Sequence, residues 1–446
     1  MSCRKIIIAV AFALVVPGAA LAAETDNVST PADAGTPKTD AQRLHSLEER
    51  VQQLESAPPP AAPPAAINSF NPAVSLILSG LYTNLSQDPA NYRITGFPVP
   101  SDTEIGPGDR GFSLAESELG IYANIDPYFY GGLNYSIHPD DTASAEEAFI
   151  QTIALSNGFT VKAGRFFSGI GYLNEQHAHV WDFVDAPLAY QAFLGTQFGD
   201  DAVQVRWLAP TDTFLEFGAE LGRGRPFPGS DRSKNGSGAG TVFAHVGGDV
   251  GLSSSWRAGL STLQTAPKDR QFTDTNIAGT DVTNSFSGDT RLWIADFVWK
   301  YAPNGNPIYT NFKLQAEYLR RRDNGDLTYD IDTGDGNPHV AQTASYDAKQ
   351  SGWYLQGVYQ FMPYWRVGLR TERLDQGTVD YSSNSANLSQ PDFNPSKNSV
   401  MVDYSPSEFS RIRVQFAQDK SRQGVTDNQA FVQYQMSLGA HGAHQF

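Results

Sequence analysis

From residue 73 onward, apolar and polar residues alternate with a period of two, in segments separated by turn-forming residues. Alternate side chains of a β-strand point to opposite faces, so each segment predicts a strand with one apolar and one polar face. The sequence predicts 16 strands, at 73–84, 112–125, 128–138, 145–155, 159–168, 201–209, 213–224, 240–250, 255–266, 290–301, 309–322, 351–361, 365–375, 397–404, 408–420 and 428–446.

The connections between these strands fall into two alternating classes. Tight turns rich in Pro, Asn, Gly, Asp and Ser lie near 126–127, 156–158, 210–212, 253–254, 303–307, 363–364 and 406–407. Every second connection is longer or more flexible: 85–111, 139–144, 169–200, 225–239, 267–289, 323–350, 376–396 and 421–427. Short turns at one end and long loops at the other are the layout of outer-membrane barrels. We therefore expect an all-β fold, a 16-stranded antiparallel transmembrane β-barrel over residues 70–446, with both ends on the short-turn, periplasmic side.

The strand faces agree with a barrel whose apolar face meets lipid and whose polar face lines a wet lumen. In 292–301, Trp293 and Phe297 share one face and Asp296 and Lys300 share the other. The segments 213–221, 365–375 and 408–420 alternate in the same way. A soluble antiparallel sheet also alternates, with its apolar face in the core. The sorting of long and short connections favours the barrel over this alternative.

The first residues predict an export signal. Arg4 and Lys5 precede an apolar run at 6–16, and Ala20-Leu21-Ala22 offers a small-x-small cleavage site. Residues 1–22 therefore read as a secretory signal peptide. The only cysteine, Cys3, lies within it, so we expect neither a disulfide nor a lipoprotein anchor.

Residues 23–38 are small and polar and are expected to be disordered. The segment 39–56 predicts a short coiled-coil helix whose a/d stripe would join three copies of the chain: Leu44, Leu47, Val51 and Leu54. The alternative is a lone surface helix. Residues 57–69 are rich in Pro and Ala and predict an extended linker between the helix and the barrel.

Composition narrows the possible functions. Charged residues make up 18% of the chain, aromatic residues 12%, and the formal net charge is -16. A nucleic-acid partner is excluded because it requires a basic face. No Ser/His/Asp constellation stands out, so we expect no enzymatic activity and no cofactor.

The chain resembles porins of Gram-negative outer membranes over residues 70–446. Phe446 ends a last strand of alternating apolar residues, which resembles the signal that such barrels present to the barrel assembly machinery. The runs 162–172 and 433–444 resemble poorly characterised outer-membrane proteins, some named TonB-dependent or zinc-regulated receptors. Residues 23–69 lack the folded plug of TonB-dependent receptors. The resemblance implies an outer-membrane location, contact with lipid and a homotrimer.

The third long connection, 169–200, is the candidate pore constriction. In porins of this resemblance the third loop folds into the barrel and narrows it; the alternative is a loop that caps the barrel. The loop holds the side chains expected at a constriction: Glu175, His177, His179, Trp181, Asp182, Asp185 and Tyr190.

Charged residues in the lumen phase of the strands would form the pore wall. The basic candidates are Arg206, Arg366, Arg370, Arg411 and Arg413, and the acidic ones are Glu116, Glu118, Glu216 and Glu220. If Asp182 and Asp185 face the arginines, the constriction carries a transverse field, which sets ion preference. Clustered arginines favour anions, whereas the negative net charge favours cations, and the sequence leaves the preference open. A second interpretation is that these charges only keep the lumen wet.

The leading function is passive diffusion of small hydrophilic solutes or ions. The alternatives are a substrate-specific or zinc-uptake channel, and a structural barrel that tethers the envelope. His177 and His179 have the spacing of two side chains on one strand face, but we expect them to act as polar aromatics rather than as metal ligands.

Overall fold

The computed structural model describes residues 72–439, apart from 102, 141, 232, 332 and 335–338. The predicted signal peptide, coiled coil, linker and C-terminal Phe446 lie outside these residues. Within the described part, no helix has the length and apolarity needed to cross a bilayer.

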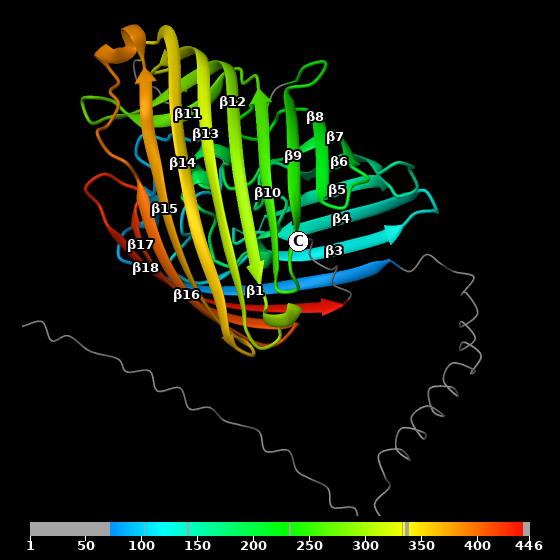
Figure 1. Ribbon diagram of the computed structural model, residues 1–446. Helices are drawn as coiled ribbons and strands as arrows, with labels where there is room; N and C mark the ends of the chain where they lie inside the picture. Colours follow the sequence, from blue (N-terminus) through cyan, green and yellow to red (C-terminus); the bar gives the residue numbers. More distant parts are fainter. Residues whose placement is uncertain are drawn as a thin grey trace, which may run out of the picture. The chain divides into compact units, whose positions relative to one another are not determined.

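The described residues form one large antiparallel sheet (Figure 1). Its strands are β1 (Ala73–Leu85), β2 (Gly111–Leu114), β3 (Ser117–Asn124), β4 (Phe129–Ile137), β5 (Ala143–Thr152), β6 (Phe159–Phe167), β7 (Gly199–Leu208), β8 (Phe214–Gly222), β9 (Ala239–Val250), β10 (Ser254–Thr265), β11 (Arg270–Thr275), β12 (Asp281–Tyr301), β13 (Asn311–Tyr329), β14 (Gln342–Met362), β15 (Trp365–Asp380), β16 (Ser396–Ser407), β17 (Ser410–Lys420) and β18 (Asp427–Gly439). Short helices lie in the connections: η1 (Pro89–Asn91), η2 (Ala178–Val180), α2 (Leu188–Leu194), η3 (Pro303–Gly305) and η4 (Ser382–Ala386).

The sheet closes on itself. β1 pairs with β18 on one side, from Ser75 opposite Gly439 to Leu85 opposite Gln429, and with β2 and β3 on the other side. β2 and β3 are two parts of one interrupted strand, and β11 continues β10 along the same partner, β12. The 18 segments of the described residues therefore make a closed barrel of 16 strands, as predicted.

The four tallest strands extend further than the sequence predicts. β12, β13, β14 and β15 run on into the connections expected to be long loops. Their extensions carry polar outward pairs such as Thr328 with Thr343, whose hydroxyls lie 2.9 Å apart, instead of an apolar stripe. Inside the extensions a small core forms from Phe272, Val282, Phe286, Leu327, Tyr329, Tyr346, Ala348 and Leu388. The extensions thus invert the pattern of the membrane-crossing parts, with apolar residues inside and polar residues outside. The outward apolar stripe used to find strands stops before them, so they were missed.

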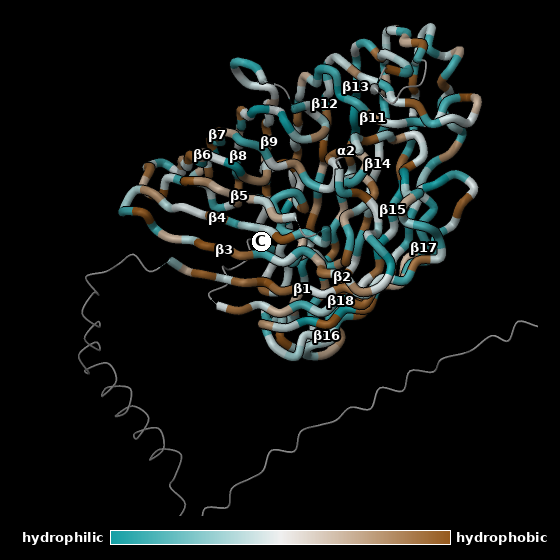
Figure 2. The backbone as a smooth tube through the Cα atoms, turned by 180° about the vertical axis from the view of Figure 1, so that it is seen from behind, coloured by the Kyte–Doolittle hydropathy of each residue, from teal (hydrophilic) through white to brown (hydrophobic). Residues whose placement is uncertain are grey.

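Apolar side chains cover the outside of the barrel. Leu369 is 65% exposed, Phe416 57% and Trp293 52%, whereas inward neighbours on the same strands, such as Arg370 and Arg413, are buried. Hydrophobic and hydrophilic positions alternate along the strands in Figure 2. A belt of exposed apolar side chains this extensive requires an apolar environment around the barrel.

The third long connection lies inside the barrel. All seven residues of α2 are buried, and the helix lies against β13, β14 and β15. Together with the loop residues Ile170, Leu173, Trp181 and Phe198 it packs on inward side chains of the wall, including Leu292, Leu319 and Leu374. The inward-folding prediction is confirmed over the capping alternative.

Candidate functional site: the lumen and its inward loop

Residues 168–198, here called the lumen loop, divide the interior of the barrel. Pro187 precedes α2, and Gly195 ends it in the left-handed conformation (φ 64°), which glycine adopts without steric cost. This cap lets the chain turn back to β7 within the width of the barrel. Every polar backbone group carried into the lumen needs a partner there, so the wall must supply hydrogen bonds to the loop.

Glu317 on β13 supplies several of these bonds. Its carboxylate accepts hydrogen bonds from the backbone N–H groups of Tyr172 (3.1 Å) and Leu173 (3.0 Å) and from the hydroxyl of Tyr190 (2.8 Å). The hydroxyl of Tyr354 on β14 donates to the same carboxylate at 2.5 Å. Tyr190, predicted in the constriction, is thus fully buried as an anchor of the loop. The sequence analysis missed Glu317, although its position in a predicted strand could have indicated an inward carboxylate.

Glu220 on β8 holds the start of the loop. It accepts hydrogen bonds from the Ser168 hydroxyl (2.5 Å) and the Gly169 N–H (2.9 Å). The Gln204 amide and the Thr241 hydroxyl also donate to it, each at 2.6 Å. Glu220 is 5% exposed, so it is a loop anchor and contributes little to the open wall of the lumen.

The loop carboxylates face the basic wall. Asp182 lies 2.7 Å from Lys313 Nζ and 3.2 Å from Arg366 Nη1. Asp185 lies 2.7 Å from Arg370 Nη2 and 2.5 Å from Lys397 Nζ. Burial by itself would raise the pKa of Asp185, but Lys397 and Arg370 hold that pKa well below its usual range. The pairs therefore neutralise much of the charge that the wall would otherwise present.

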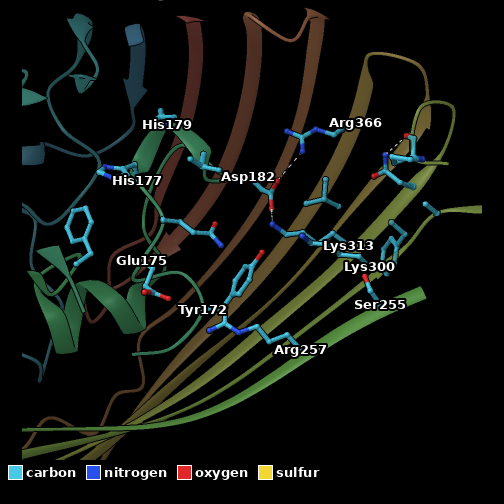
Figure 3. A pocket seen from close by; sticks show the side chains of 18 of the residues that line it. Tyr172, Glu175, His177, His179, Asp182, Ser255, Arg257, Lys300, Lys313 and Arg366 are labelled. Carbon is cyan, nitrogen blue, oxygen red and sulfur yellow. Dashed lines mark hydrogen bonds and ion pairs between the residues drawn. The ribbon is translucent and has the colours of Figure 1, made fainter. Parts of the chain in front are cut away.

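A cavity of about 1010 Å³ lies between the loop and the wall. It reaches the short-turn end, where residues of the β9–β10 and β12–β13 turns line it. Figure 3 shows His177, His179 and Glu175 on one side and Lys300, Lys313 and Arg366 on the other, with Asp182 between them. The open space is thus flanked by carboxylate and imidazole groups on one side and mainly by ammonium and guanidinium groups on the other.

The predicted basic wall divides into two groups. Arg366 lines the cavity. Arg370 and Arg413 are 3% and 1% exposed and bind the loop, Arg413 through the Trp181 carbonyl at 2.7 Å. Arg411 donates to the His179 carbonyl at 2.6 Å, and Arg206 pairs with Glu175. These side chains point into the lumen as predicted, but the loop occupies the space that they would have faced.

The remaining predicted residues also make loop or wall contacts. Glu216 lies 3.1 Å from His245 Nδ1, and Trp181 is 5% exposed. Glu116 and Glu118 lie on the acidic side, where Glu118 lies 2.6 Å from His179 Nδ1 and 3.4 Å from His177 Nδ1. Residues that the sequence analysis did not select complete this side: Asn134, Glu146 and Glu147.

No model of a known protein family matches the chain. It is 33% identical to an uncharacterised protein of Aquifex aeolicus over 358 residues, which cover 76% of this chain and 70% of that protein.

Solved structures of outer-membrane proteins resemble it at low sequence identity. The trimer form of OmpT from Vibrio cholerae is 12% identical with a TM-score of 0.49, covering 82% of this chain and 99% of that chain. The anion-selective porin from Comamonas acidovorans gives the same four values. The channel DcaP of Acinetobacter baumannii is 13% identical with a TM-score of 0.47, covering 82% and 97%.

Proposed function

The chain belongs to the same family as the Aquifex aeolicus protein, and we propose that this member is an outer-membrane channel for small hydrophilic solutes or ions. The observation that carries the proposal is the closed barrel with apolar residues outside and a polar, charged cavity inside. A structure with these two surfaces suits lipid on one side and water on the other.

The lumen loop makes this channel narrow. It is tied to β8 by Glu220, to β13 and β14 by Glu317 and Tyr354, and to β15 and β16 by Arg370 and Lys397. Contacts on several sides of the lumen leave little free cross-section, so passage is limited to small solutes. This favours a constricted channel over a wide general pore.

The assembled protein is a homotrimer in the outer membrane, with the 39–56 segment in the periplasm. The support is the a/d stripe from Leu44 to Leu54 and the position of the described chain ends, Ala73 and Gly439, at the short-turn end. Lipid contacts the apolar belt, and the barrel assembly machinery inserts the chain.

The test is conductance of the purified protein in planar lipid bilayers. We expect discrete steps of small unit size that occur in groups of three. A channel with a charged lumen also gives a nonzero reversal potential in a salt gradient, which identifies its ion preference. The channel function would be contradicted if neither the folded wild type nor a folded variant with a shortened lumen loop gave conductance steps.

A substrate-specific uptake channel is the second candidate function. The two-sided lining of the cavity favours it, because opposed charges can orient a solute that carries both signs. Saturation of conductance by such a solute, and not by simple salt, would distinguish it from passive diffusion.

A further inference from the structure

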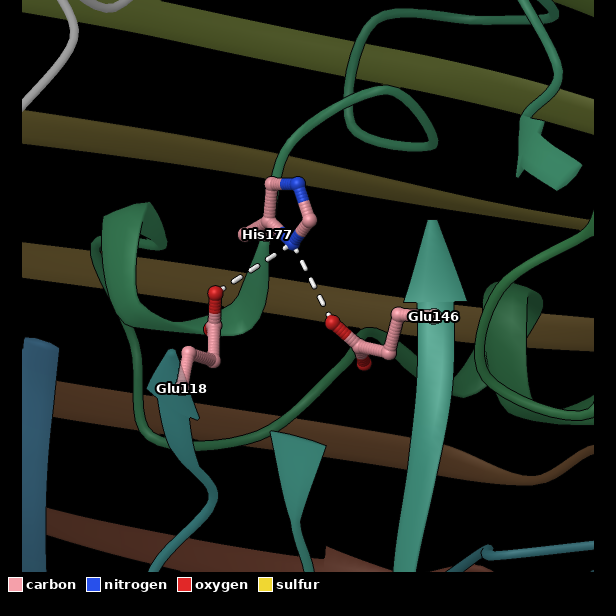
Figure 4. A group of neighbouring side chains, drawn as sticks. All are labelled: Glu118, Glu146 and His177. Atoms are coloured by element: carbon pink, nitrogen blue, oxygen red, sulfur yellow. Dashed lines mark hydrogen bonds and ion pairs between the residues drawn. The ribbon is translucent and has the colours of Figure 1, made fainter. Parts of the chain in front are cut away.

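Five ionisable side chains gather where the lumen loop meets the wall formed by β3, β4 and β5. Glu118 extends from β3 and Glu146 and Glu147 from β5, while His177 and His179 come from the loop at η2. Figure 4 shows three of them, Glu118, Glu146 and His177. Glu118, Glu147, His177 and His179 line the cavity beside the lumen loop, so an ion in the lumen can reach them.

The backbone of β5 brings two adjacent carboxylates to one side. Neighbouring strand residues normally face opposite ways. Here Asn134 of β4 pairs with Glu147 while Tyr135 pairs with Ala145, so Glu146 is the extra residue of a β-bulge. Bulges redirect side chains next to functional sites. Both side chains are shielded, Glu146 being 13% exposed and Glu147 11%.

Three of the ligand atoms converge on one point. His177 Nδ1 lies 3.4 Å from Glu118 Oε2 and 3.2 Å from Glu146 Oε2, and the three atoms all lie within 4.8 Å of one another. Ligands at about 2.0–2.2 Å from a metal ion are separated by roughly 3–4 Å. A single ion between the three side chains can therefore contact each of them.

The other nitrogen of His177 is already oriented. Its Nε2 lies 3.1 Å from Glu147 Oε2, and the other oxygen of Glu147 accepts hydrogen bonds from Lys162 Nζ (3.4 Å) and the Phe167 N–H (3.3 Å). With the proton on Nε2, the lone pair of Nδ1 points at Glu118 and Glu146. A carboxylate on the far nitrogen is the usual support of a metal-binding histidine.

Asn134 Oδ1 is a buried polar atom at this site with no hydrogen-bond partner among the described residues. Asn134 is 2% exposed, and its amide faces the cluster, with Nδ2 at 2.8 Å from Glu118 Oε2 and 2.9 Å from His177 Nδ1. Rotating this amide by half a turn would direct its oxygen at the same point. A buried acceptor without a partner is costly, and a cation would satisfy it.

Without a metal, these carboxylates would have to share a protonated His177, the Lys162 ammonium group and hydrogen bonds from Asn134 and His179. We propose instead that Glu118, Glu146 and His177 bind one divalent transition-metal ion, oriented by Glu147 and approached from the lumen. One imidazole with carboxylates selects first-row ions such as Zn²⁺ or Mn²⁺ over Ca²⁺, which takes six to eight oxygen ligands. The bound ion would also fasten the lumen loop to β3 and β5.

The test is Zn²⁺ binding to the full chain, purified without a polyhistidine tag and stripped with a chelator. Titration calorimetry should show saturable binding of Zn²⁺ that Ca²⁺ does not displace. X-ray absorption should show one imidazole nitrogen with carboxylate oxygens at about 2.0–2.2 Å. Glu146→Gln and His177→Gln should abolish this binding, and Glu147→Gln should weaken it by about 10–100-fold because it removes only the orienting group.

His245→Gln is the matched control, because His245 is also a lumen histidine paired with a single carboxylate, Glu216. It should bind Zn²⁺ as the wild type does. The folded state of each variant is checked by its heat-dependent gel mobility. Absence of saturable Zn²⁺ binding in the folded wild type, or equal binding by folded Glu146→Gln and His177→Gln, would overturn the proposal. Zn²⁺ binding is measured without any conductance measurement, so the metal-site proposal can fail or succeed independently of the proposed channel function.

Discussion

Asp185 contributes more to the stability of the folded barrel than most single residues, because it lies between two buried cations. Lys397 and Arg370 are 1% and 3% exposed, and Asp185 lies within 2.7 Å of both charged groups. Their remaining acidic partners are Asp419, 3.4 Å from Lys397 Nζ, and Glu372, 2.7 Å from Arg370 Nε. Charges this deeply buried are tolerated only when they are paired.

Asp185→Asn should therefore destabilise the folded barrel by about 3 kcal/mol, near the low end for a broken buried pair because Asp419 and Glu372 still compensate in part. The measurement is the denaturant midpoint of the folded protein in detergent.

Asp347→Asn serves as the matched control, since its partner Arg322 is 56% exposed and the pair is worth at most about 1 kcal/mol.

The pKa of Asp185 is lowered in the folded protein, so its contribution to stability is complete above the unfolded pKa of about 3.9 and is lost as pH falls through the lower folded pKa. The stability gap between the wild type and Asp185→Asn should hold from pH 7 to about pH 4 and close below it. Equal midpoints at pH 7 would contradict the assigned role of Asp185.

At the scale of elements, the lumen loop determines how much of the lumen is open. Replacing residues 183–194 with a short Gly/Ser linker removes α2 and the anchors at Asp185 and Tyr190. We expect the unit conductance in bilayers to rise severalfold, because removing α2 opens a lumen whose wall carries many charged side chains beside the apolar patch of Leu292, Leu319 and Leu374.

Because α2 is part of the interior core, the replacement must first be shown to fold, by its heat-dependent gel mobility. The double variant Asp182→Asn/Asp185→Asn loosens the loop without shortening it. Its unit conductance is an independent check that the attached loop limits the pore. A folded linker variant with wild-type conductance would show that the loop does not limit the pore.

The elements also show what a sequence can predict. The strands that cross the apolar belt were predicted because lipid requires an apolar residue at every second position. The extensions of β12 to β15 were missed because their outward residues, such as Thr328 and Thr343, need no apolar character. The turns were identified from their composition. The connection expected at 267–289 contains a strand, because β10 continues as β11 after residues 266–269.

The candidate site was only partly predictable for a related reason. The structure places the predicted loop residues and arginines inside the barrel, but alternation gives the face of a strand and not the pairing across the lumen. Glu317, Glu146 and Glu147 gain their roles from neighbours more than 25 residues away in the chain, such as Tyr172 and His177. The bulge that turns Glu146 toward His177 leaves no mark in the hydrophobic pattern.

At the scale of the whole molecule, an outer-membrane channel must present its outer surface to lipid and keep its lumen loop away from lipid. Trp293 on β12 is 52% exposed on the outer face, whereas Trp181 in the lumen loop is 5% exposed and donates its indole N–H to the Gln176 carbonyl at 2.8 Å. A soluble fold would bury Trp293 in its core, and neither Trp293 nor Trp181 would then contact lipid. The two tryptophans therefore report the inside and the outside of the barrel separately.

Fluorescence quenching by brominated lipids, in reconstituted variants that keep only Trp293 or only Trp181, tests this arrangement most directly. Bromine on the lipid chains quenches only rings that contact them, so we predict strong quenching of Trp293 and little of Trp181. Quenching of Trp181 equal to that of Trp293, or quenching of neither, would contradict a barrel with an apolar outer surface in lipid and an inward loop in its lumen.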